Sequence, residues 1–515
     1  METPALIAAL LKPDAYPHAV GAVRLIETHI SWVLIAGDFA YKLKKPLDLG
    51  FLDFSTLEKR RHFCDEEIRL NRRLAPEIYL DVVAVTGSES APRIDGDGPV
   101  LDWAVRMRAF PPDATLDWAT ELTTDQIDAI ADALARFHRD LPPAPAASTY
   151  GGTSAVLQPA LENFAQIRAL SPTLATRTIL DRLDAWTRQE GERLAPAFAE
   201  RRDTGFIREC HGDLHLGNIA WVADAPLIFD CIEFNPALRW IDVLSELAFL
   251  FMDLVHRERT DLAWRLLNRY LEHTGDYAGL PVFRFYLVYR AMVRAKVAAI
   301  RAHQQPNAGD SELLGYLALA ERLSRPLPAA LMLMHGVSGS GKTWLAQQVL
   351  ERLGAVRLRS DVERKRLFGL TALEDSRRIE GGIYTEAASA RTFQRLLDLA
   401  HQLLLAGYAV IVDATFLKQA HRAPFVQLAG ELQVPLRILS LQADATLLRQ
   451  RVRQRLAEAH DASEADLTVL EMQLQGIEPF TEAESKQVVV FRADESAEWL
   501  RRIPGLLEGM PETAF

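Results

Sequence analysis

One short segment constrains the fold of this chain more than any other. The apolar residues 331–335 run directly into Gly336-Val-Ser-Gly-Ser-Gly-Lys-Thr343, and residues with helical spacing follow. The segment matches the pattern GxxxxGK[ST], which needs a strand before it and a helix after it. Because a strand, a tight loop and a helix must follow one another here, the sequence predicts α/β structure in this part of the chain.

The residue types in Gly336–Thr343, which we call the phosphate loop, suit the binding of a nucleotide. The glycines let backbone N–H groups point inward at phosphate oxygens, and the start of the following helix adds a favourable partial charge. Lys342 is expected to reach the β- and γ-phosphates of ATP, and the Thr343 hydroxyl to ligate Mg²⁺. The residues predicted to bind the nucleotide are Gly336, Ser338, Gly339, Ser340, Gly341, Lys342 and Thr343.

Strand and helix patterns alternate around the phosphate loop, from residue 329 to residue 515. Such alternation is typical of a parallel sheet that is covered by helices on both faces. Before it, helix propensity breaks at Ser-Arg-Pro-Leu-Pro, residues 324–328, which we predict to be a linker. The predicted strands of the sheet are 330–335, 355–359, 408–412, 436–441 and 487–491.

Charged residues follow two of these strands. Asp361 comes after the second strand, at the carboxyl end where such folds place their chemistry. It is a candidate base for an acceptor hydroxyl, and Arg364 is a candidate for holding the acceptor or a phosphate group. Asp361 also suits the N-cap of a helix over 362–368, and the two roles are compatible. Asp413 ends an apolar strand and is predicted to position Mg²⁺ through water or to bind the acceptor.

Four arginines lie within residues 447–456. Arg451 and Arg455 are four residues apart, so they share one face of a helix. They are candidates for a lid that closes over the transferring phosphate. A solvated helical face is an equally good interpretation of the same pattern.

Residues 22–110 show strand patterns around one helix. Gly37-Asp38 separates two of the strand patterns and indicates a hairpin. Helical spacing begins at Ser55 and continues to residue 74. A mostly helical region follows at 121–322, with a strand-rich centre at 206–234. The predicted strands before it are 31–36, 39–44, 82–86 and 101–108.

A second group of residues with phosphotransfer chemistry lies in that centre. His211-Gly-Asp-Leu-His-Leu-Gly-Asn218 is followed by an apolar segment that ends in Asp230. The spacing is that of the catalytic loop and metal-binding strand in protein-kinase-like folds. Asp213 is predicted to orient and deprotonate an acceptor hydroxyl, and Asn218 and Asp230 to hold Mg²⁺. A transition-metal site built from the same histidines and aspartates is the less favoured alternative.

Both halves resemble known kinases. The His-Gly-Asp opening at residues 211–213 is similar to that of aminoglycoside and choline kinases. The phosphate loop, with Asp361, Arg364, Asp413 and the arginine pair, resembles the small P-loop kinases of the zeta-toxin and polynucleotide-kinase type. The order of the two halves resembles a bacterial family of fused predicted kinases.

The resemblance implies two domains of different fold class. Residues 1–323 are expected to form an α+β, protein-kinase-like domain of the aminoglycoside phosphotransferase type. Its N-lobe would span about 20–110 and its C-lobe about 111–323. After the linker at 324–328, residues 329–515 are expected to form an α/β P-loop domain with a parallel sheet.

The resemblance also implies a lysine on a strand and a glutamate on the next helix. The run FAYKLK makes Lys42 the favoured phosphate clamp, and Lys44, on the same face, competes with it. Glu67 is the expected partner of the lysine, and Glu66 is the alternative. Asp242 resembles a downstream acid that braces the catalytic loop. The segment that would cover the phosphates, residues 27–32, departs from the family because it contains no glycine.

Composition limits the partners and the compartment. The chain has 58 basic and 69 acidic residues among 515, and a net charge of −11 argues against a large nucleic-acid surface. Three cysteines without a CxxC pair favour a reducing compartment. The sequence contains neither a signal-peptide pattern nor 18 consecutive apolar residues. We therefore expect a cytoplasmic protein that does not bind a membrane.

These expectations combine into a bifunctional ATP-dependent phosphotransferase with two Mg·ATP sites. Each site would transfer the γ-phosphate to a hydroxyl of a small-molecule acceptor. One alternative is a single active kinase, in the N-terminal half, that a nucleotide-binding P-loop module regulates. Another is a polynucleotide 5′-hydroxyl kinase in the C-terminal half, which the clustered arginines leave open. Asp361 and Arg364 favour catalysis over regulation, because a nucleotide sensor needs no acceptor base.

Overall fold

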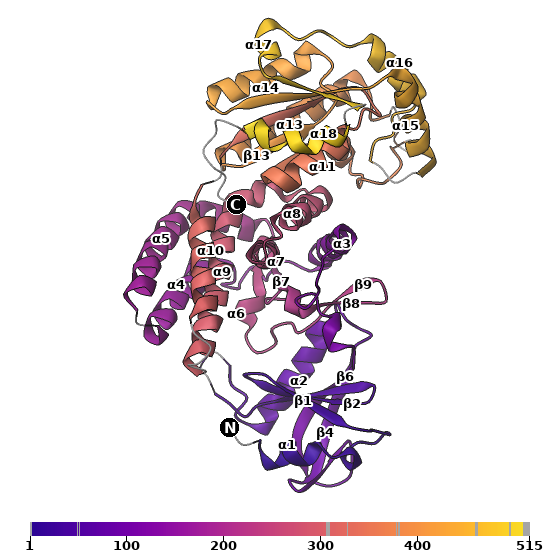
Figure 1. Cartoon of the computed structure of the whole chain (residues 1–515). Coiled ribbons are helices and arrows are strands. Elements are labelled where there is room, and N and C mark those ends of the chain that lie inside the picture. Colours follow the sequence, from indigo (N-terminus) through magenta and orange to yellow (C-terminus); the bar gives the residue numbers. More distant parts are fainter. Residues whose placement is uncertain are drawn as a thin grey trace. The chain divides into compact units, whose positions relative to one another are not determined.

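A computed structural model describes most of the chain, which forms two compact units (Figure 1). One unit comprises Met1–Val156 and Phe198–Leu250, and the other Leu157–Ala197 and Phe251–Phe515. The predicted boundary at residues 324–328 does not coincide with this division and stays a prediction about domains. The described residues are 3–48, 50, 52–171, 173–304, 310–326, 328–376, 379, 382–458, 462–493 and 496–507.

The first unit begins with a six-stranded antiparallel sheet in the order β1-β2-β3-β6-β4-β5. The hairpin predicted at Gly37-Asp38 is confirmed, because it joins β2 to β3. Strands β1 and β5 were not among the strands predicted from the sequence. The strands are β1 (Val23–Glu27), β2 (Ser31–Ala36), β3 (Phe39–Lys44), β4 (Tyr79–Ser88), β5 (Ala91–Ile94) and β6 (Val100–Arg108).

Helix α2 (Leu57–Asn71) packs against β4 and β6 through an apolar cluster that includes Cys64 and Ile68. The expectation that Ser55 opens this helix is wrong by one residue. Thr56 is the N-cap, because its side chain accepts a hydrogen bond from the Lys59 N–H. The hydroxyl and the N–H of Ser55 instead bind Asp53.

The strand-rich centre predicted at 206–234 is confirmed by three strands, β7, β8 and β9. β8 and β9 form an antiparallel hairpin, and β7 pairs with β10, which the sequence did not suggest. Helices α4, α5 and α7 belong partly to each unit. The remaining elements of this part of the chain are α1 (Ala5–Leu10), η1 (Pro13–Ala15), η2 (Pro112–Ala114), α3 (Thr124–Asp140), α4 (Thr153–Leu170), α5 (Leu174–Asp203), β7 (Ile207–Glu209), η3 (Leu216–Asn218), β8 (Ile219–Val222), β9 (Ala225–Ile228), α6 (Pro236–Arg239), β10 (Trp240–Asp242) and α7 (Val243–His256).

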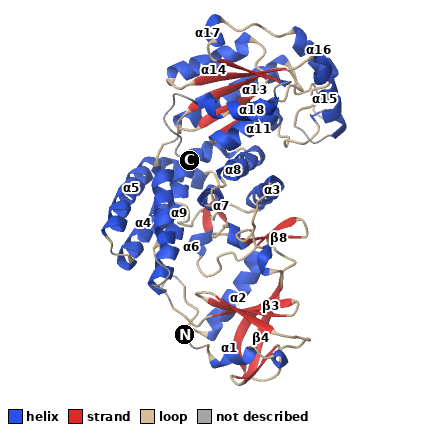
Figure 2. Cartoon of the chain, viewed as in Figure 1, coloured by secondary structure: helices blue, strands red, loops and turns tan. Residues whose placement is uncertain are grey.

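The second unit contains a five-stranded parallel sheet in the order β12-β13-β11-β14-β15, with helices on both faces (Figure 2). All five predicted strands are confirmed to within one residue at each end. The central strand β11 leads into the phosphate loop, and β12 forms one edge. The strands are β11 (Ala330–His335), β12 (Ala355–Arg359), β13 (Ala409–Asp413), β14 (Leu436–Gln442) and β15 (Val488–Arg492).

The other helices of the second unit fall into two groups, those that precede the parallel sheet in the sequence and those that lie within or after it. None of its helices, nor any other helix in the described part of the chain, has an apolar stretch long enough to cross a bilayer. The helices before the sheet are α8 (Thr260–Thr274), η4 (Asp276–Gly279), α9 (Leu280–Gln304) and α10 (Ser311–Ser324). Those within and after it are α11 (Lys342–Leu353), α12 (Ser360–Leu367), α13 (Glu386–Leu405), α14 (Gln419–Glu431), α15 (Ala445–Glu458), α16 (Leu467–Gln475), α17 (Glu482–Ser485), α18 (Ser496–Arg502) and η8 (Pro504–Leu507).

Candidate active sites

Five charged side chains from β3, α2 and the segment after β9 meet inside the first unit. Lys42 Nζ lies 2.8 Å from Glu67 Oε1 and also contacts Asp230. Lys44 Nζ lies 2.7 Å from Glu67 Oε2 and also contacts Glu233. Glu67 therefore pairs with both candidate lysines, so the ionic contact that the sequence analysis expected between strand and helix is present twice.

Burial and charge act in opposite directions on these groups. Burial disfavours ionisation of Glu67, but the two lysines outweigh it and lower the pKa of Glu67 to about 2. Burial also opposes the charge on Lys42, yet Asp230 and Glu67 raise its pKa well above the usual value. Glu233 differs, because burial raises its pKa despite the contact with Lys44. The cluster thus holds Lys42 cationic and Glu67 anionic.

Lys42 and Lys44 differ in how close they lie to solvent. Lys44 is fully buried, and its Nζ lies 4.9 Å from the centre of the Phe54 ring. Lys42 contacts Asp230, whose side chain is 44% exposed, so Lys42 lies at the open end of the cluster. The Lys42 side chain is itself only 11% exposed and that of Lys44 is not exposed at all, so of the two lysines only Lys42 borders a group that solvent reaches. The geometry therefore favours Lys42 as the phosphate clamp and gives Lys44 a structural role.

Substitution of each lysine should separate these roles. Lys44→Met leaves Glu233 without a counter-charge in the interior, so we expect a loss of about 3–5 kcal/mol of stability, as for other broken buried pairs. Lys42→Met should instead raise the KM for ATP with a smaller loss of stability, because Glu67 keeps Lys44. Urea denaturation and initial rates measure the two effects. The reverse pattern would make Lys44 the clamp.

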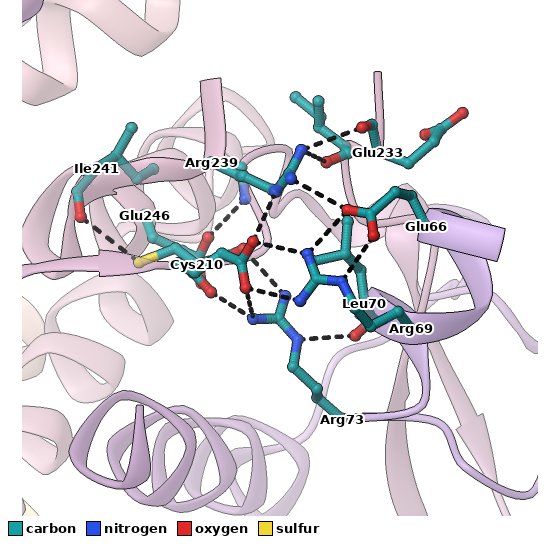
Figure 3. A network of polar contacts seen from close by, with 12 residues as sticks. Glu66, Arg69, Leu70, Arg73, Cys210, Glu233, Arg239, Ile241 and Glu246 are labelled. Carbon is teal, nitrogen blue, oxygen red and sulfur yellow. Dashed lines mark hydrogen bonds and ion pairs between the residues drawn. The ribbon is translucent and has the colours of Figure 1, made fainter. Parts of the chain in front are cut away.

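Glu66, the alternative partner for the lysine, lies in a different network (Figure 3). In the described part of the chain, only arginines contact its carboxylate: Arg69 at 2.8 Å and Arg239 at 3.3 Å. The same two arginines bind Glu209, at 2.8 and 3.0 Å. Arg73, just beyond the end of α2, also contacts Glu209. The network fixes α2 to β7, the strand that leads into the predicted catalytic loop.

Hydrogen bonds hold the predicted catalytic loop in place. His211 Nε2 lies 2.8 Å from the Phe229 carbonyl oxygen, and the Asp213 N–H donates to His211 Nδ1 at 3.3 Å. Asn218 Nδ2 donates to the Asp213 carbonyl at 2.9 Å and lies 3.3 Å from its carboxylate. The Asp213 side chain remains 38% exposed. The loop therefore presents a fixed carboxylate to solvent, where an acceptor hydroxyl has access.

Glu246, a buried residue to which the sequence analysis gave no role, binds the backbone of this loop. Glu246 accepts a hydrogen bond from the Gly212 N–H at 2.7 Å and lies 2.9 Å from His138 Nε2. Asp242, which resembles a bracing acid, is bound by Arg201 at 2.6 Å and caps the start of α7. The only sequence signal for Glu246 is a carboxylate within an apolar helix, which indicates a buried partner but not which one.

The geometry at Asp230 fits a magnesium nucleotide better than a transition metal. Asp230 has φ of 66°, an uncommon value for a residue other than glycine, and its N–H donates to the Tyr79 hydroxyl at 3.1 Å. Asn218 uses its amide nitrogen on Asp213, so its amide oxygen is left for a cation. Carboxylate and amide oxygens suit Mg²⁺. Within the described residues, the one cluster with transition-metal spacing is elsewhere, at His138, Cys210 and Glu246.

In the second unit, the backbone of the phosphate loop depends on its glycines. Gly339 and Gly341 have φ of 82° and 98°, and a Cβ at Gly336 would lie 2.8 Å from the Leu441 carbonyl oxygen. Lys342 Nζ reaches across the loop to the Val337 carbonyl at 2.9 Å. The buried Ser340 hydroxyl oxygen has no hydrogen-bond partner among the described residues. A cradle of this shape with an unsatisfied donor fits a phosphate group.

One of the two predicted lid arginines reaches the phosphate loop. Arg451 Nη1 lies 3.4 Å from the Gly339 carbonyl oxygen. Arg455 instead donates to the Ala465 carbonyl at 2.6 Å, beyond the end of α15. The loop has a further partner that sequence analysis did not identify, because Gln473 of α16 accepts a hydrogen bond from the Ser338 N–H at 2.7 Å.

The other predicted residues of this half lie at the carboxyl edge of the sheet. Asp361 is the second residue of α12, and Arg359 is the N-cap, so the N-cap interpretation of Asp361 is wrong. Arg364 Nη1 donates to the Ile383 carbonyl and to Ser389 Oγ, at 3.2 and 3.1 Å. Its buried Nε has no partner in the described part of the chain. Asp413 ends β13, next to the central strand β11.

Comparison with known proteins finds matches to both halves. Residues 58–286 match the phosphotransferase enzyme family, and residues 331–480 match a family described as an AAA domain. Uncharacterized proteins of Mycobacterium tuberculosis and Mycobacterium bovis are 31% identical over 441 residues. The matched region covers 85% of this chain and 87% of each relative.

Several solved structures also match. A choline kinase from Cryptosporidium parvum covers 58% of this chain with 89% of its own, at 10% identity and a TM-score of 0.38. A gluconokinase from Sinorhizobium meliloti covers 35% of this chain with 93% of its own, at 22% identity and a TM-score of 0.27. The APS kinase of Mycobacterium tuberculosis covers 36% of this chain with 100% of its own, at 20% identity and a TM-score of 0.27.

Proposed function

The chain belongs to one family with these mycobacterial proteins and joins a phosphotransferase-family domain to a P-loop AAA domain, and from this premise we propose that it is a bifunctional kinase with two separate Mg·ATP sites. Each site transfers the γ-phosphate of ATP to a hydroxyl group of a small molecule. The kinase activity itself follows from the two domain types. The second active site and the class of acceptor are the new elements.

A complete set of phosphotransfer groups in each unit carries this proposal. The first unit combines a lysine clamp, Lys42, with an accessible carboxylate, Asp213. The second combines the phosphate loop with Asp361, at the same edge of the parallel sheet. Both sets have the groups that bind a nucleotide and a group that accepts the proton of an alcohol.

In the first unit, Lys42 binds the nucleotide phosphates while Glu67 fixes its ammonium group. Asn218 and Asp230 would hold Mg²⁺, which when bound neutralises charge on the phosphates. Asp213 orients the acceptor hydroxyl and takes its proton as the bond to phosphorus forms. The hydrogen bonds from His211 and Asn218 keep the Asp213 backbone in place during this step.

In the second unit, Lys342 and the backbone of the phosphate loop bind the β- and γ-phosphates, and Thr343 and Asp413 would hold the cation. Asp361 takes the proton of the acceptor hydroxyl. Arg364 orients the acceptor through the guanidinium nitrogen that has no partner among the described residues. A purely regulatory P-loop module has no acceptor for Asp361 or for the unpartnered nitrogen of Arg364 to bind, so catalysis is the better interpretation.

Calorimetry with a non-hydrolysable Mg·ATP analogue tests the two-site proposal on the full chain. We expect two binding sites in the parent protein and one in Lys342→Ala, because the variant loses the phosphate-loop lysine. Asp230→Asn should weaken the other site. Lys486→Ala is the matched control, since this lysine is 74% exposed and its one ion pair among the described residues is with Glu482. One site in the parent, or two intact sites in Lys342→Ala, would refute the proposal.

A further inference from the structure

Helix α8, which precedes the parallel sheet in the chain, lies along its edge strand β12. Trp264, Asn268 and Glu272 are four residues apart and therefore share one face of α8. Trp264 covers Gly354, at the start of β12, so closely that a Cβ there would lie 2.7 Å from its indole nitrogen. Contacts of all three side chains with the sheet show that this face of α8 belongs to the phosphate-loop half of the molecule.

Asn268 satisfies the backbone of the edge strand. Its Nδ2 donates to the Ala355 carbonyl at 2.9 Å, and its Oδ1 accepts from the Arg357 N–H at 2.7 Å. These are the hydrogen bonds that a further strand would make. The contact fixes the position of α8 relative to β12 residue by residue, which places Glu272 beside the arginines of that strand.

Glu272 binds both arginines of β12. Its Oε1 accepts from Arg357 Nε and Nη2 at 3.0 and 2.5 Å, and its Oε2 from Arg359 Nη1 at 3.4 Å. All three side chains are at least 85% buried. Burial works against ionisation of Glu272, but the two guanidinium groups outweigh it and lower its pKa to about 2. The carboxylate is therefore charged and held by two cations at neutral pH.

Another carboxylate lies within reach of the same arginines. Arg359 is in register with Asp413 on the neighbouring parallel strand, and adjacent strands are about 4.8 Å apart. Asp413 is only 6% exposed, yet its side chain has no ion-pair partner in the part of the chain that the structure describes. A buried carboxylate next to an arginine normally pairs with it, because attraction between charges is strong where water is excluded. Here Arg359 contacts Glu272.

We propose that Glu272 of α8 holds Arg359 away from Asp413 and so keeps this carboxylate open for the Mg²⁺ of the nucleotide at the phosphate loop. Glu272 is then a positioning residue that a helix outside residues 329–515 supplies to the phosphate-loop site. This inference rests on the Mg·ATP site proposed above. A role in packing alone would predict that Glu272 affects stability but not the requirement for Mg²⁺.

The test measures how binding of a non-hydrolysable ATP analogue depends on Mg²⁺ concentration, in the full chain with the other site weakened by Asp230→Asn. In Glu272→Gln, we expect the Mg²⁺ concentration at half-saturation to rise about tenfold, because the released Arg359 competes for Asp413. Adding Arg359→Gln to this variant should restore the parent value. Arg265→Gln is the matched control, since this residue of α8 pairs with Glu351 on α11 instead of with β12.

Three outcomes would overturn the inference. An unchanged Mg²⁺ requirement in Glu272→Gln means that Arg359 does not compete for Asp413. A raised requirement that Arg359→Gln fails to restore means that the effect has another cause. Arg359→Gln alone, which needs no variant at Glu272 to fold, should bind like the parent, and weaker binding would give Arg359 a direct role in the site. Absence of binding at the phosphate loop in the parent would instead refute the proposed function, and this inference with it.

Discussion

Asp213→Asn should reduce phosphotransfer at the N-terminal site by about two to four orders of magnitude, the range for loss of one general base. The variant should still bind Mg·ATP, because the proposed mechanism assigns Asp213 to the acceptor and Lys42, Asn218 and Asp230 to the nucleotide. Transfer of labelled γ-phosphate to an acceptor from a metabolite extract measures the first effect, and calorimetry the second. Loss of transfer with intact binding is the expected result.

The control for this prediction is Asp65→Asn, which neutralises an exposed carboxylate of the same unit whose one ion pair in the described part of the chain is with Arg61. It should leave both measurements unchanged. Asp230→Asn should differ from Asp213→Asn by weakening nucleotide binding as well. Normal turnover in Asp213→Asn would show that residues 211–218 are not the catalytic loop.

Asp361→Asn should reduce transfer at the phosphate-loop site by a similar factor, about two to four orders of magnitude. ATP affinity should persist, because Lys342 and the loop backbone are intact. The cost in stability should be small, at most about 1 kcal/mol, since Asp361 lies in the first turn of α12, where a negative charge interacts with the helix dipole. Labelled transfer, nucleotide binding and thermal unfolding of the full chain separate the three effects.

A matched control for Asp361 is Glu386→Gln, which neutralises an exposed carboxylate in the first turn of α13. It changes the same helix-dipole interaction without touching the proposed acceptor site. Equal transfer by Asp361→Asn and the control would leave Asp361 with a helix-terminal role only. ATP hydrolysis that is equal in both variants, with no acceptor found, would favour the regulatory P-loop module.

The parallel strands and the phosphate loop could be predicted because each depends mainly on residues that are close together in the sequence. The strands of the parallel sheet are continuous apolar runs between helical segments, and a phosphate loop needs glycines at fixed spacing, so both could be read from the sequence. The short strands β5 and β10 were missed because three or four residues carry too little pattern. The choice between Lys42 and Lys44 was undetermined, because residues two apart in a strand share one face.

Residues that act through distant contacts could not be predicted. Glu246 supports the catalytic loop from α7, Gln473 binds the phosphate loop from α16, and Glu272 binds β12 from α8. Each depends on where another element of the fold lies, and no spacing in the sequence records that. Asp361 shows the same limit on a smaller scale. Its position after a strand was predictable, but the start of α12 one residue earlier was not.

The contact between Asn268 and β12 also affects whether the two halves could be encoded by separate genes. A gene that was split at residues 324–328 would encode a sheet whose outer strand presents bare N–H and carbonyl groups, the kind of surface on which proteins aggregate. It would also remove Glu272, the carboxylate that Arg357 and Arg359 contact. Separating the two halves would therefore lower the solubility of the C-terminal half, independently of any effect on catalysis, which gives selection a physical reason to keep both domains on one polypeptide.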